Sequence, residues 1–196
     1  MKELKERRSI RKFKQTPIES ELLCDFVDCA RLAPSAANLQ PLKYVAENRP
    51  EMNAKIFPLT KWAAYLKGEG TPKTGEEPTA YIAILHDTSI SSNYADTDAG
   101  AAAMSIIIAA QNKGIASCWL ASVDRSAFSV LYNLPENYKI HSVIALGYPA
   151  EESHPVEFKG DVKYFRNPDQ SLSVPKRALS EVLVSHRRAE LNMPYN

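Results

Sequence analysis

The apolar positions along the chain are spaced like those of helices in some stretches and like those of strands in others. Residues 16–19 (Thr-Pro-Ile-Glu) predict a helix start, in which Thr16 caps the helix and Glu19 completes a capping box. Pro34 is expected to end this helix. Between the two signals, apolar residues recur at helical spacing, at Leu22, Leu23, Phe26, Val27, Ala30 and Ala33.

The longest helix is predicted over residues 94–113, with Gly114 as its C-cap. Within 99–110, only Gly100 and Ser105 are not apolar. A helix that is apolar on all sides is usually buried on all sides. The pattern therefore predicts a central core helix, or a helix packed against a second subunit.

The other predicted elements are shorter. A charged helix over 2–8 is expected to be anchored by Leu4, and Gly147-Tyr148-Pro149 should end the last strand. Residues 150–174 show little periodicity. The uneven alternation of elements suits one domain of the α+β or α/β class, with helices on both faces of a small sheet. The remaining helices are predicted at 50–57, 124–132 (capped by Asp124) and 177–184, and the strands at 42–47, 81–85, 117–122 and 139–146.

Residues 58–78 form a long connection with no clear period, rich in Lys, Glu, Gly and Pro. Irregular segments longer than about 12–15 residues are usually functional or mobile, so a lid-like role is expected. Trp62 and Tyr65 lie in its first part. They could line a pocket or anchor the segment to the core, and the sequence favours neither.

Composition narrows the possible partners. With 44% apolar and 24% charged residues and a net charge of +1, the chain resembles an ordinary globular protein and offers no global field for nucleic acid or an anionic membrane. The N-terminus has no signal-peptide pattern, and the longest apolar run falls short of the roughly 20 residues of a membrane span. Cys24, Cys29 and Cys118 lack C-x-x-C spacing and are predicted to be buried thiols in a reducing cytoplasm.

No motif indicates a protein nucleophile, an acid–base pair or a metal site. The histidines are scattered, and His141, within an apolar strand, is expected to be a core residue. The chain lacks a G-x-S-x-G elbow, a Walker loop and a G-x-G-x-x-G turn. If the protein is an enzyme, a cofactor should therefore carry the difficult chemistry. The other histidines are His86, His154 and His186.

The segment Arg7-Arg8-Ser9-Ile10-Arg11 places three guanidinium groups and a hydroxyl within five residues. Composition alone favours a solvated charge run. The alternative is a phosphate site, because Arg offers a bidentate fork and alternate residues of an extended stretch project to one side. Lys176 and Arg177 form a second basic cluster, and we predict that the two clusters meet around one phosphate.

Five motifs in series give the chain a resemblance to a known family. Each motif is weak alone, but together they span nearly the whole chain in order. On them, the sequence resembles the FMN-dependent nitroreductase family. The motifs are residues 7–13 (Arg-Arg-Ser-Ile-Arg-Lys-Phe), 34–41 (Pro-Ser-Ala-Ala-Asn-Leu-Gln-Pro), 98–110 (beginning Asp-Ala-Gly-Ala-Ala), 114–119 (Gly-Ile-Ala-Ser-Cys-Trp), and 147–149 completed by 175–177 and Glu181-Val182.

The resemblance implies a three-layer α/β/α sandwich with a small mixed, mainly antiparallel sheet, built as an intertwined homodimer. FMN would lie at the dimer interface, where Arg7 and Ser9, with Lys176 or Arg177, hold its phosphate. Arg8 would add backbone or side-chain contacts, and Arg11 would approach the pyrimidine edge of the ring. The partner subunit would supply the loop residues Pro34, Ser35, Ala36 and Asn38. Leu120, Ala121 and Ser122 would lie along the ring, with a backbone N–H near flavin N5.

The implied activity is oxidation of NAD(P)H through FMN, with electrons passed to an acceptor such as a nitroaromatic or a quinone. No catalytic side chain is expected beyond the flavin. Two positions depart from the family pattern: Leu42 stands where an aromatic is common, and Ala121-Ser122 stand where Glu-Gly or Gly-Gly is common.

Three alternatives remain open. The first is a specialised flavoprotein of the same fold, for dehalogenation or ring oxidation, with substrate groups in 58–78. The second is a flavin-binding protein that does not turn over. The third is a nucleic-acid-binding module that uses residues 7–14, although the near-zero net charge and the absence of interleaved aromatics argue against it.

Overall fold

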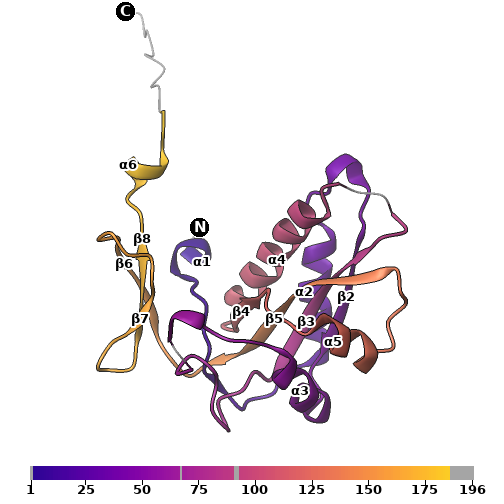
Figure 1. Cartoon of the computed structure of the whole chain (residues 1–196), viewed down its shortest axis with the longest axis horizontal. Helices are drawn as coiled ribbons and strands as arrows, with labels where there is room; N and C mark the ends of the chain where they lie inside the picture. The colour runs from indigo at the N-terminus through magenta and orange to yellow at the C-terminus, as the bar shows by residue number, and fades with distance from the viewer. Residues whose placement is uncertain (1, 67, 91–92, 186–196) are drawn as a thin grey trace, which may run out of the picture.

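A central antiparallel sheet organises the structure (Figure 1), which is a computed structural model describing residues 2–66, 68–90 and 93–185. The long strand β5 (Tyr138–Pro149) lies in the middle, with β3 (Ala80–Asp87) on one edge and β2 (Leu42–Glu47) beyond it. The other edge of β5 pairs with β4 (Ala116–Leu120) and with β1 (Phe13–Lys14). The strands predicted at 42–47 and 81–85 are confirmed, and that at 117–122 begins and ends slightly earlier.

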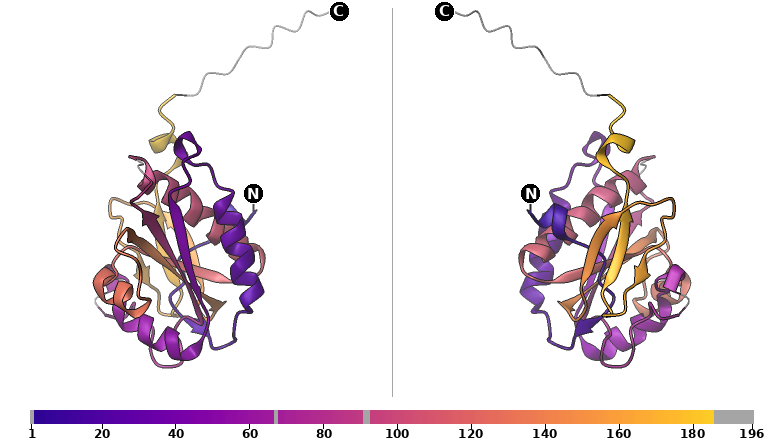
Figure 2. Two further views of the ribbon diagram at one scale, coloured as in Figure 1. Left: turned by 90° about the vertical axis from the view of Figure 1, so that its right-hand side faces the viewer. Right: turned by 90° about the vertical axis from the view of Figure 1, so that its left-hand side faces the viewer.

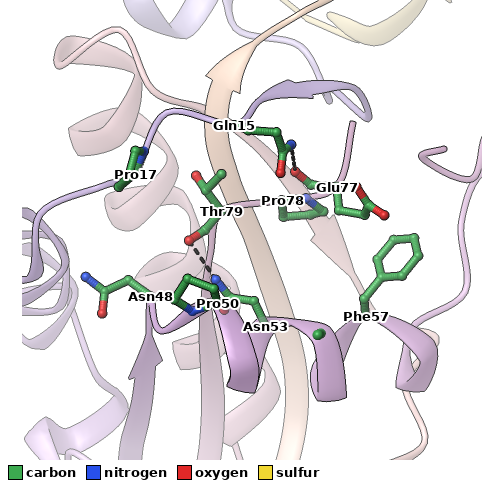
Figure 3. Close-up of a pocket in the computed structure, with 10 residues that line it drawn as sticks. Gln15, Pro17, Asn48, Pro50, Asn53, Phe57, Glu77, Pro78 and Thr79 are labelled. Atoms are coloured by element: carbon green, nitrogen blue, oxygen red, sulfur yellow. Dashed lines mark hydrogen bonds between the residues drawn. The ribbon is translucent and has the colours of Figure 1, made fainter. Parts of the chain in front are cut away.

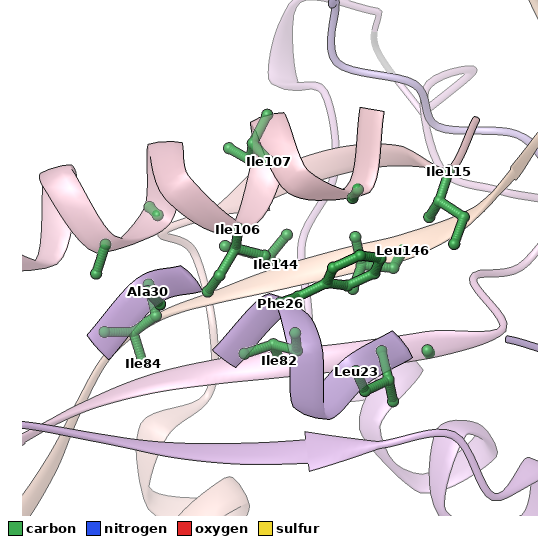
Figure 4. Close-up of a cluster of buried hydrophobic side chains, with 14 of the residues drawn as sticks. Leu23, Phe26, Ala30, Ile82, Ile84, Ile106, Ile107, Ile115, Ile144 and Leu146 are labelled. Carbon is green, nitrogen blue, oxygen red and sulfur yellow. The ribbon is translucent and has the colours of Figure 1, made fainter. Parts of the chain in front are cut away.

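Helices cover both faces of this sheet, as predicted. Figure 1 shows α2 (Ser20–Arg31) and α4 (Ala95–Asn112) on one face, with α3 (Pro50–Ile56) and α5 (Arg125–Leu131) on the other. Alternate residues of β3 serve the two cores: Ile82 packs under α2 and α4, while Tyr81 packs with α3 and α5. Figure 4 shows the first core, in which Phe26 and Ile106 meet the sheet.

Two helix starts were predicted from N-cap signals, and only one of these predictions is confirmed. Asp124 caps α5 by accepting a hydrogen bond from the Ala127 N–H, as predicted. The capping box at 16–19 is wrong, because α2 starts at Ser20 and its N-cap residue Glu19 makes no side-chain cap. The side chain of Ile18 is buried in the core. We attribute the displaced start to this burial, which holds the preceding residues outside the helix.

A second, three-stranded sheet stands beside the main one. It consists of β6 (Ser153–Glu157), β7 (Phe165–Arg166) and β8 (Leu172–Lys176), with β8 parallel to β6 and antiparallel to β7. Figure 2 shows these strands on one side of the molecule, followed by α6 (Leu179–Val182). This sheet was not predicted, since its strands are too short to display a period. The C-terminal helix that was predicted over 177–184 is shorter than expected, because α6 has only four residues.

Several local predictions need correction. Leu4, in α1 (Lys2–Glu6), is half exposed and does not anchor that helix to the chain's own core. Cys24 and Cys29 are exposed, and only Cys118 is buried, which raises its pKa to about 11. Gly147 does not end β5: the strand continues to Pro149, and the ring of Phe13 packs where a Cβ at Gly147 would lie.

The central helix α4 is confirmed within two residues of its predicted limits. Its burial is less complete than predicted, because one side is only partly buried in the single chain, at Gly100, Ala101, Met104, Ser105, Ile108 and Ala109. None of the helices in the described part of the chain combines the length and apolarity needed to cross a bilayer.

Glu47 links the sheet edge to α5 and is expected to make folding stability depend on acid. Its nearly buried carboxylate accepts hydrogen bonds from the Arg49 side chain, from the backbone N–H groups of Asn48 and Arg49, and from the Tyr132 hydroxyl. Chiefly because of the Arg49 side chain, the pKa of Glu47 falls to about 2. A lowered pKa contributes stability above the unfolded-state pKa, and this contribution is lost as pH falls through the folded-state value.

We therefore expect Glu47→Gln to unfold at lower urea than the wild type at pH 6. The difference between the two urea midpoints should shrink between about pH 4.5 and about pH 2. Urea unfolding of both proteins across this range is the measurement. A difference that stays constant with pH would show that Glu47 does not titrate with folding.

Candidate functional site

The basic segment 7–11 runs along the open edge of β4. Ser9 forms a parallel bridge with Ser117, and the Ile10 N–H donates to the Ser117 carbonyl at 3.0 Å. Ile10 is buried and so fixes the segment against the sheet. The segment therefore lies as an extended strand-like stretch, in agreement with the geometry that was predicted to align Arg7, Ser9 and Arg11.

The three guanidinium groups of this segment have unsatisfied hydrogen-bonding capacity. The Nε atoms of Arg7, Arg8 and Arg11 are each buried and have no partner among the described residues. Burial and then the charge of Arg7 lower the pKa of Arg8. A buried donor without an acceptor is costly, and three cationic donors in five residues suit an anionic oxygen-rich group. These residues therefore fit the phosphate and carbonyl oxygens of a flavin nucleotide.

Arg11 is tied to the small sheet as well as to β4. Its guanidinium lies over the ring of Tyr164, 4.7 Å from the centroid, and the Tyr65 ring packs on Tyr164 at 5.2 Å. Tyr65 is half exposed, whereas Trp62 is buried and donates from Nε1 to Thr60 Oγ1 at 2.9 Å. The two aromatics therefore have different roles. Trp62 anchors the connection to the core, and Tyr65 packs at a tilt against Tyr164 beside Arg11.

A buried ion pair holds the small sheet to the basic segment. Glu151 Oε1 accepts from the Arg11 backbone N–H at 2.6 Å, and Glu151 Oε2 receives both Nη atoms of Arg166 at 3.1 Å. The side chains of Glu151 and Arg166 are 3% and 9% exposed. One carboxylate therefore fixes the backbone of Arg11 and β7 together.

The loop 34–41 is shaped by Asp98 of α4. Ser35 Oγ donates to Asp98 Oδ2 at 2.6 Å, and the Ala36 N–H donates to Asp98 Oδ1 at 3.0 Å. Ser35 Oγ also accepts from the Gln40 N–H, so this hydroxyl joins Asp98 of α4 to the far end of the loop. Ala37, Asn38 and Gln40 have φ angles of 50°, 54° and 52°, in the left-handed region. The loop therefore presents the exposed amide of Asn38 on a strained but well-anchored turn.

The loop and the basic segment lie at opposite ends of α4. Asp98 is in the first turn of α4, whereas Glu3 of α1 shares a hollow with Met104 and Asn112 towards the other end. Residues 98 and 112 are about 21 Å apart along a helix axis. Figure 1 also shows loop 34–41 well separated from α1. Within one chain, the two groups of site residues are therefore not brought together.

The exit from β4 places a short backbone stretch beside the long connection. Leu120 is buried, while Ala121 and Ser122 are exposed. The Ser122 carbonyl accepts from the Lys61 N–H at 3.0 Å, and the Ala121 carbonyl accepts from Arg125. The N–H groups of Ala121 and Ser122 donate no hydrogen bond in the portion of the chain that the structure describes. They remain free for a ligand.

Lys176 and Arg177 lie at the end of β8 and just after it. The Arg177 guanidinium stacks on Phe158 at 4.3 Å and pairs with Glu181 at 3.6 Å, while Lys176 is exposed. Over residues 2–66, 68–90 and 93–185, no hydrogen bond or ion pair joins either residue to 7–11. The structure of one chain thus leaves the predicted meeting of the two basic clusters as a prediction.

The histidines contribute little to this site. His141 is partly exposed rather than a core residue: its Nδ1 lies 2.9 Å from Ser142 Oγ, and its Nε2 lies 3.8 Å from Asp96. Burial lowers the pKa of His141. His186 lies outside the described residues. Across the positions that are described, no group of three or more His, Cys, Asp or Glu could hold a metal ion.

Sequence reasoning missed four residues that shape the site: Tyr164, Glu151, Arg166 and the loop-anchoring role of Asp98. Asp98 had a usable signal, since it opens the Asp-Ala-Gly-Ala-Ala motif. Glu151 and Arg166 had none, because a buried charge pair is visible only after the small sheet is in place.

Fold and site together define a class of protein: an α+β chain whose mainly antiparallel sheet lies between helices and whose N-terminal segment carries three arginines with buried, unpartnered Nε atoms. Comparison with known proteins makes the class specific. The model of the nitroreductase family matches residues 4–148. The chain therefore belongs to the nitroreductase family, and it is an oxidoreductase.

Relatives of this chain carry consistent names. An Archaeoglobus fulgidus protein named as an NADH dehydrogenase/NAD(P)H nitroreductase is 32% identical over 171 residues, covering 84% of this chain and 91% of that protein. An FMN-dependent nitroreductase structure from Clostridium difficile R20291 is 26% identical with a TM-score of 0.63, covering 76% and 87% of the two chains. A Parabacteroides distasonis structure with a TM-score of 0.67 and 22% identity, covering 85% and 96%, shares the fold.

Proposed function

We propose that this protein is an FMN-dependent oxidoreductase that transfers hydride from NAD(P)H to an electron acceptor such as a nitroaromatic or a quinone. One observation carries the proposal: three buried guanidinium Nε atoms lie without partners in one five-residue segment. The names of the relatives, which include NAD(P)H nitroreductase and FMN-dependent nitroreductase, support it. When bound, FMN would supply the hydride chemistry between donor and acceptor.

The residues of this chain would bind and orient the cofactor. Arg7 and Ser9, with Lys176 or Arg177, would hold the phosphate, and Arg8 would add positive charge. Arg11 would face the pyrimidine edge of the ring, where a cation stabilises the negative charge of the reduced state. Its position is fixed from behind by the Glu151 carboxylate and the Tyr164 ring. The free N–H groups of Ala121 and Ser122 would lie near flavin N5, with Leu120 beside them.

The active unit would be a homodimer of this chain. The enzyme would work in the cytoplasm. The partly buried apolar side of α4 borders a hollow of about 560 Å³, lined by residues such as Met104 and Ile108, which a second copy could cover. The separation of loop 34–41 from the basic segment along α4 supports the same arrangement. Pro34, Ser35, Ala36 and Asn38 of one subunit would then edge the flavin bound by the other.

The connection 58–78 would act as a lid on this single domain of residues 1–196. Its start is fixed to the β4 exit by the Lys61–Ser122 hydrogen bond and by a bridge between Thr60 and Val123. Its Tyr65 ring reaches Tyr164 beside Arg11. The acceptor would therefore approach the flavin beside this aromatic pair.

Absorption spectroscopy and a turnover assay test the proposal together. Protein purified with added FMN should be yellow, carry one FMN per chain, and oxidise NADH or NADPH when a quinone is added. Protein that stays colourless and ignores FMN would refute the proposal. A yellow protein that never oxidises either nicotinamide would indicate a flavin-binding protein without turnover.

Arg7→Ala should weaken FMN binding about 10- to 100-fold. Removing a charged donor from an anion usually costs about 1.5–3 kcal/mol. The melting temperature of the FMN-free protein should not fall, because Arg7 and Arg8 repel each other. Fluorescence quenching of FMN on titration gives the affinity. Lys14→Ala removes an exposed cation just beyond the segment and serves as the matched control. Equal FMN affinity in all three proteins would place the phosphate elsewhere.

A further inference from the structure

A second cavity lies between α3 and the segments that flank β1 and β3. Its volume is about 330 Å³. The walls are mainly apolar, from Pro17, Pro50, Pro78, Ala54 and Phe57. Figure 3 shows Asn53 and Thr79 in the middle of the lining, with Pro17 and Asn48 on one side and Phe57 and Glu77 on the other. Apart from Glu77 and Pro78, which end the connection 58–78, none of these residues belongs to the proposed flavin site.

The three amide side chains around the cavity each donate hydrogen bonds to the chain itself. Asn53 Nδ2 donates to the Thr79 carbonyl at 2.8 Å, and Asn48 Nδ2 donates to the Ile18 carbonyl at 2.9 Å. Gln15 Nε2 donates to the Glu77 carbonyl at 3.0 Å. Their side-chain oxygens receive no hydrogen bond from the described residues. The groups that remain for a ligand are therefore mainly acceptor oxygens, together with the Thr79 hydroxyl, which can also donate.

Two of the polar atoms at the centre are buried and unsatisfied. Asn53 Oδ1 and Thr79 Oγ1 have no hydrogen-bond partner among the described residues, and Asn53 is 8% exposed. Thr79 is fixed by its N–H, which donates to the Leu146 carbonyl at 3.0 Å. A buried polar group without a hydrogen-bond partner costs about 1–3 kcal/mol, so both groups need a partner.

We propose that this cavity binds a small aromatic ring that carries N–H donors on one edge, such as an aminated nitrogen heterocycle. The proline and phenylalanine walls suit a flat apolar body, and Asn53 Oδ1 and Thr79 Oγ1 suit its N–H edge. The lining contains one carboxylate, Glu77, and no cation, which disfavours an anionic ligand. At about 330 Å³, the cavity lies at the lower end of ligand sites and accepts a ring system rather than a dinucleotide.

Adenine and purine are the matched probes, because they share a ring system and only adenine carries the exocyclic amine. The experiment is a titration of the FMN-loaded protein, followed by backbone amide chemical shifts. Adenine should shift the signals of Asn53, Ala54 and Thr79, and it should bind at least about fivefold more tightly than purine. Equal binding of adenine and purine, or no shift at these three residues, would overturn the proposal and leave the cavity as a water site.

Two substitutions locate the binding. Thr79→Val keeps the side-chain shape, so the melting temperature should hold or rise, while adenine affinity falls about 3- to 10-fold. Ala54→Phe should abolish binding by filling the cavity from an exposed wall position, without touching Asn53. Thr97→Val, at an exposed position of α4, is the control and should bind adenine like the wild type. Adenine affinity that survives both Thr79→Val and Ala54→Phe would refute the site.

Discussion

Glu151→Ala is expected to lower the free energy of unfolding by about 3–5 kcal/mol, because it leaves a buried cation without its partner. The Arg166 guanidinium would keep only the Gln170 carbonyl, and the Arg11 N–H would lose its acceptor. Both are shielded from water in the intact structure. Urea unfolding gives the loss, and hydrogen exchange should show it first in β7 and around Arg11, which the carboxylate joins.

Two comparisons make this result specific to the buried pair. Asp161→Ala removes an exposed carboxylate that pairs with Lys163, and it should leave the unfolding free energy unchanged within error. Glu151→Leu combined with Arg166→Met should recover most of the loss, since a buried pair can often be replaced by apolar side chains of similar volume. If Glu151→Ala costs no more than Asp161→Ala, then the carboxylate does not join the small sheet to the basic segment.

The parts of the fold that were predictable from sequence are those whose local pattern reports burial. α4 and β3 are long, nearly continuous apolar runs, so their type is confirmed and their limits lie within two residues of those predicted. The small sheet gave no such signal, because β7 has two residues and β6 and β8 contain Pro155 and Pro175. Its pairing depends on contacts between residues far apart in sequence.

Local signals failed where tertiary packing opposed them. The residues at 16–19 match a capping box, but burial of Ile18 places the helix start at Ser20. Cys24 and Cys29 were predicted to be buried from the general tendency of the residue type. They fall outside the inward stripe of α2, formed by Leu23, Phe26 and Ala30, and are therefore exposed.

The residues that are predicted to face a ligand lie in local sequence motifs, whereas the residues that support them do not. The Arg-rich segment and loop 34–41 are contiguous in sequence, so their composition indicates their chemistry. The contact that fixes Arg11 joins it to Glu151, 140 residues later in the chain. No periodicity or motif connects two such positions. The candidate ligand-binding residues can therefore be found from local sequence motifs, whereas the contacts that position them cannot.

A mixed dimer of two defective subunits is expected to regain one tight FMN site. The first subunit carries Arg7→Ala, and the second carries Ser35→Ala with Asn38→Ala. The Ser35 substitution removes the hydroxyl that joins Asp98 to the Gln40 N–H, which should release the strained turn at Ala37–Gln40. Each homodimer then has two damaged sites and should retain FMN poorly.

The recovery of one tight FMN site follows from the positions of the substituted residues in the dimer. The basic segment and loop 34–41 stand at opposite ends of α4, so in the proposed dimer each flavin contacts the segment of one subunit and the loop of the other. Mixing the variants places both defects in one site and leaves the second site intact. If both groups served a flavin within one subunit, the mixed dimer would instead have two singly damaged sites and no tight FMN.

Differently tagged subunits, co-expressed and purified for both tags, allow the FMN bound per dimer to be counted by absorbance after dialysis. A mixed dimer of wild type and Arg7→Ala should retain one FMN in either arrangement, and it therefore calibrates the count. One tight FMN in the doubly defective mixed dimer, against none in either homodimer, would establish that the two subunits build each site together. No tight FMN there, beside one in the calibrating dimer, would place Arg7 and Asn38 in the same subunit's site and remove the partner from it.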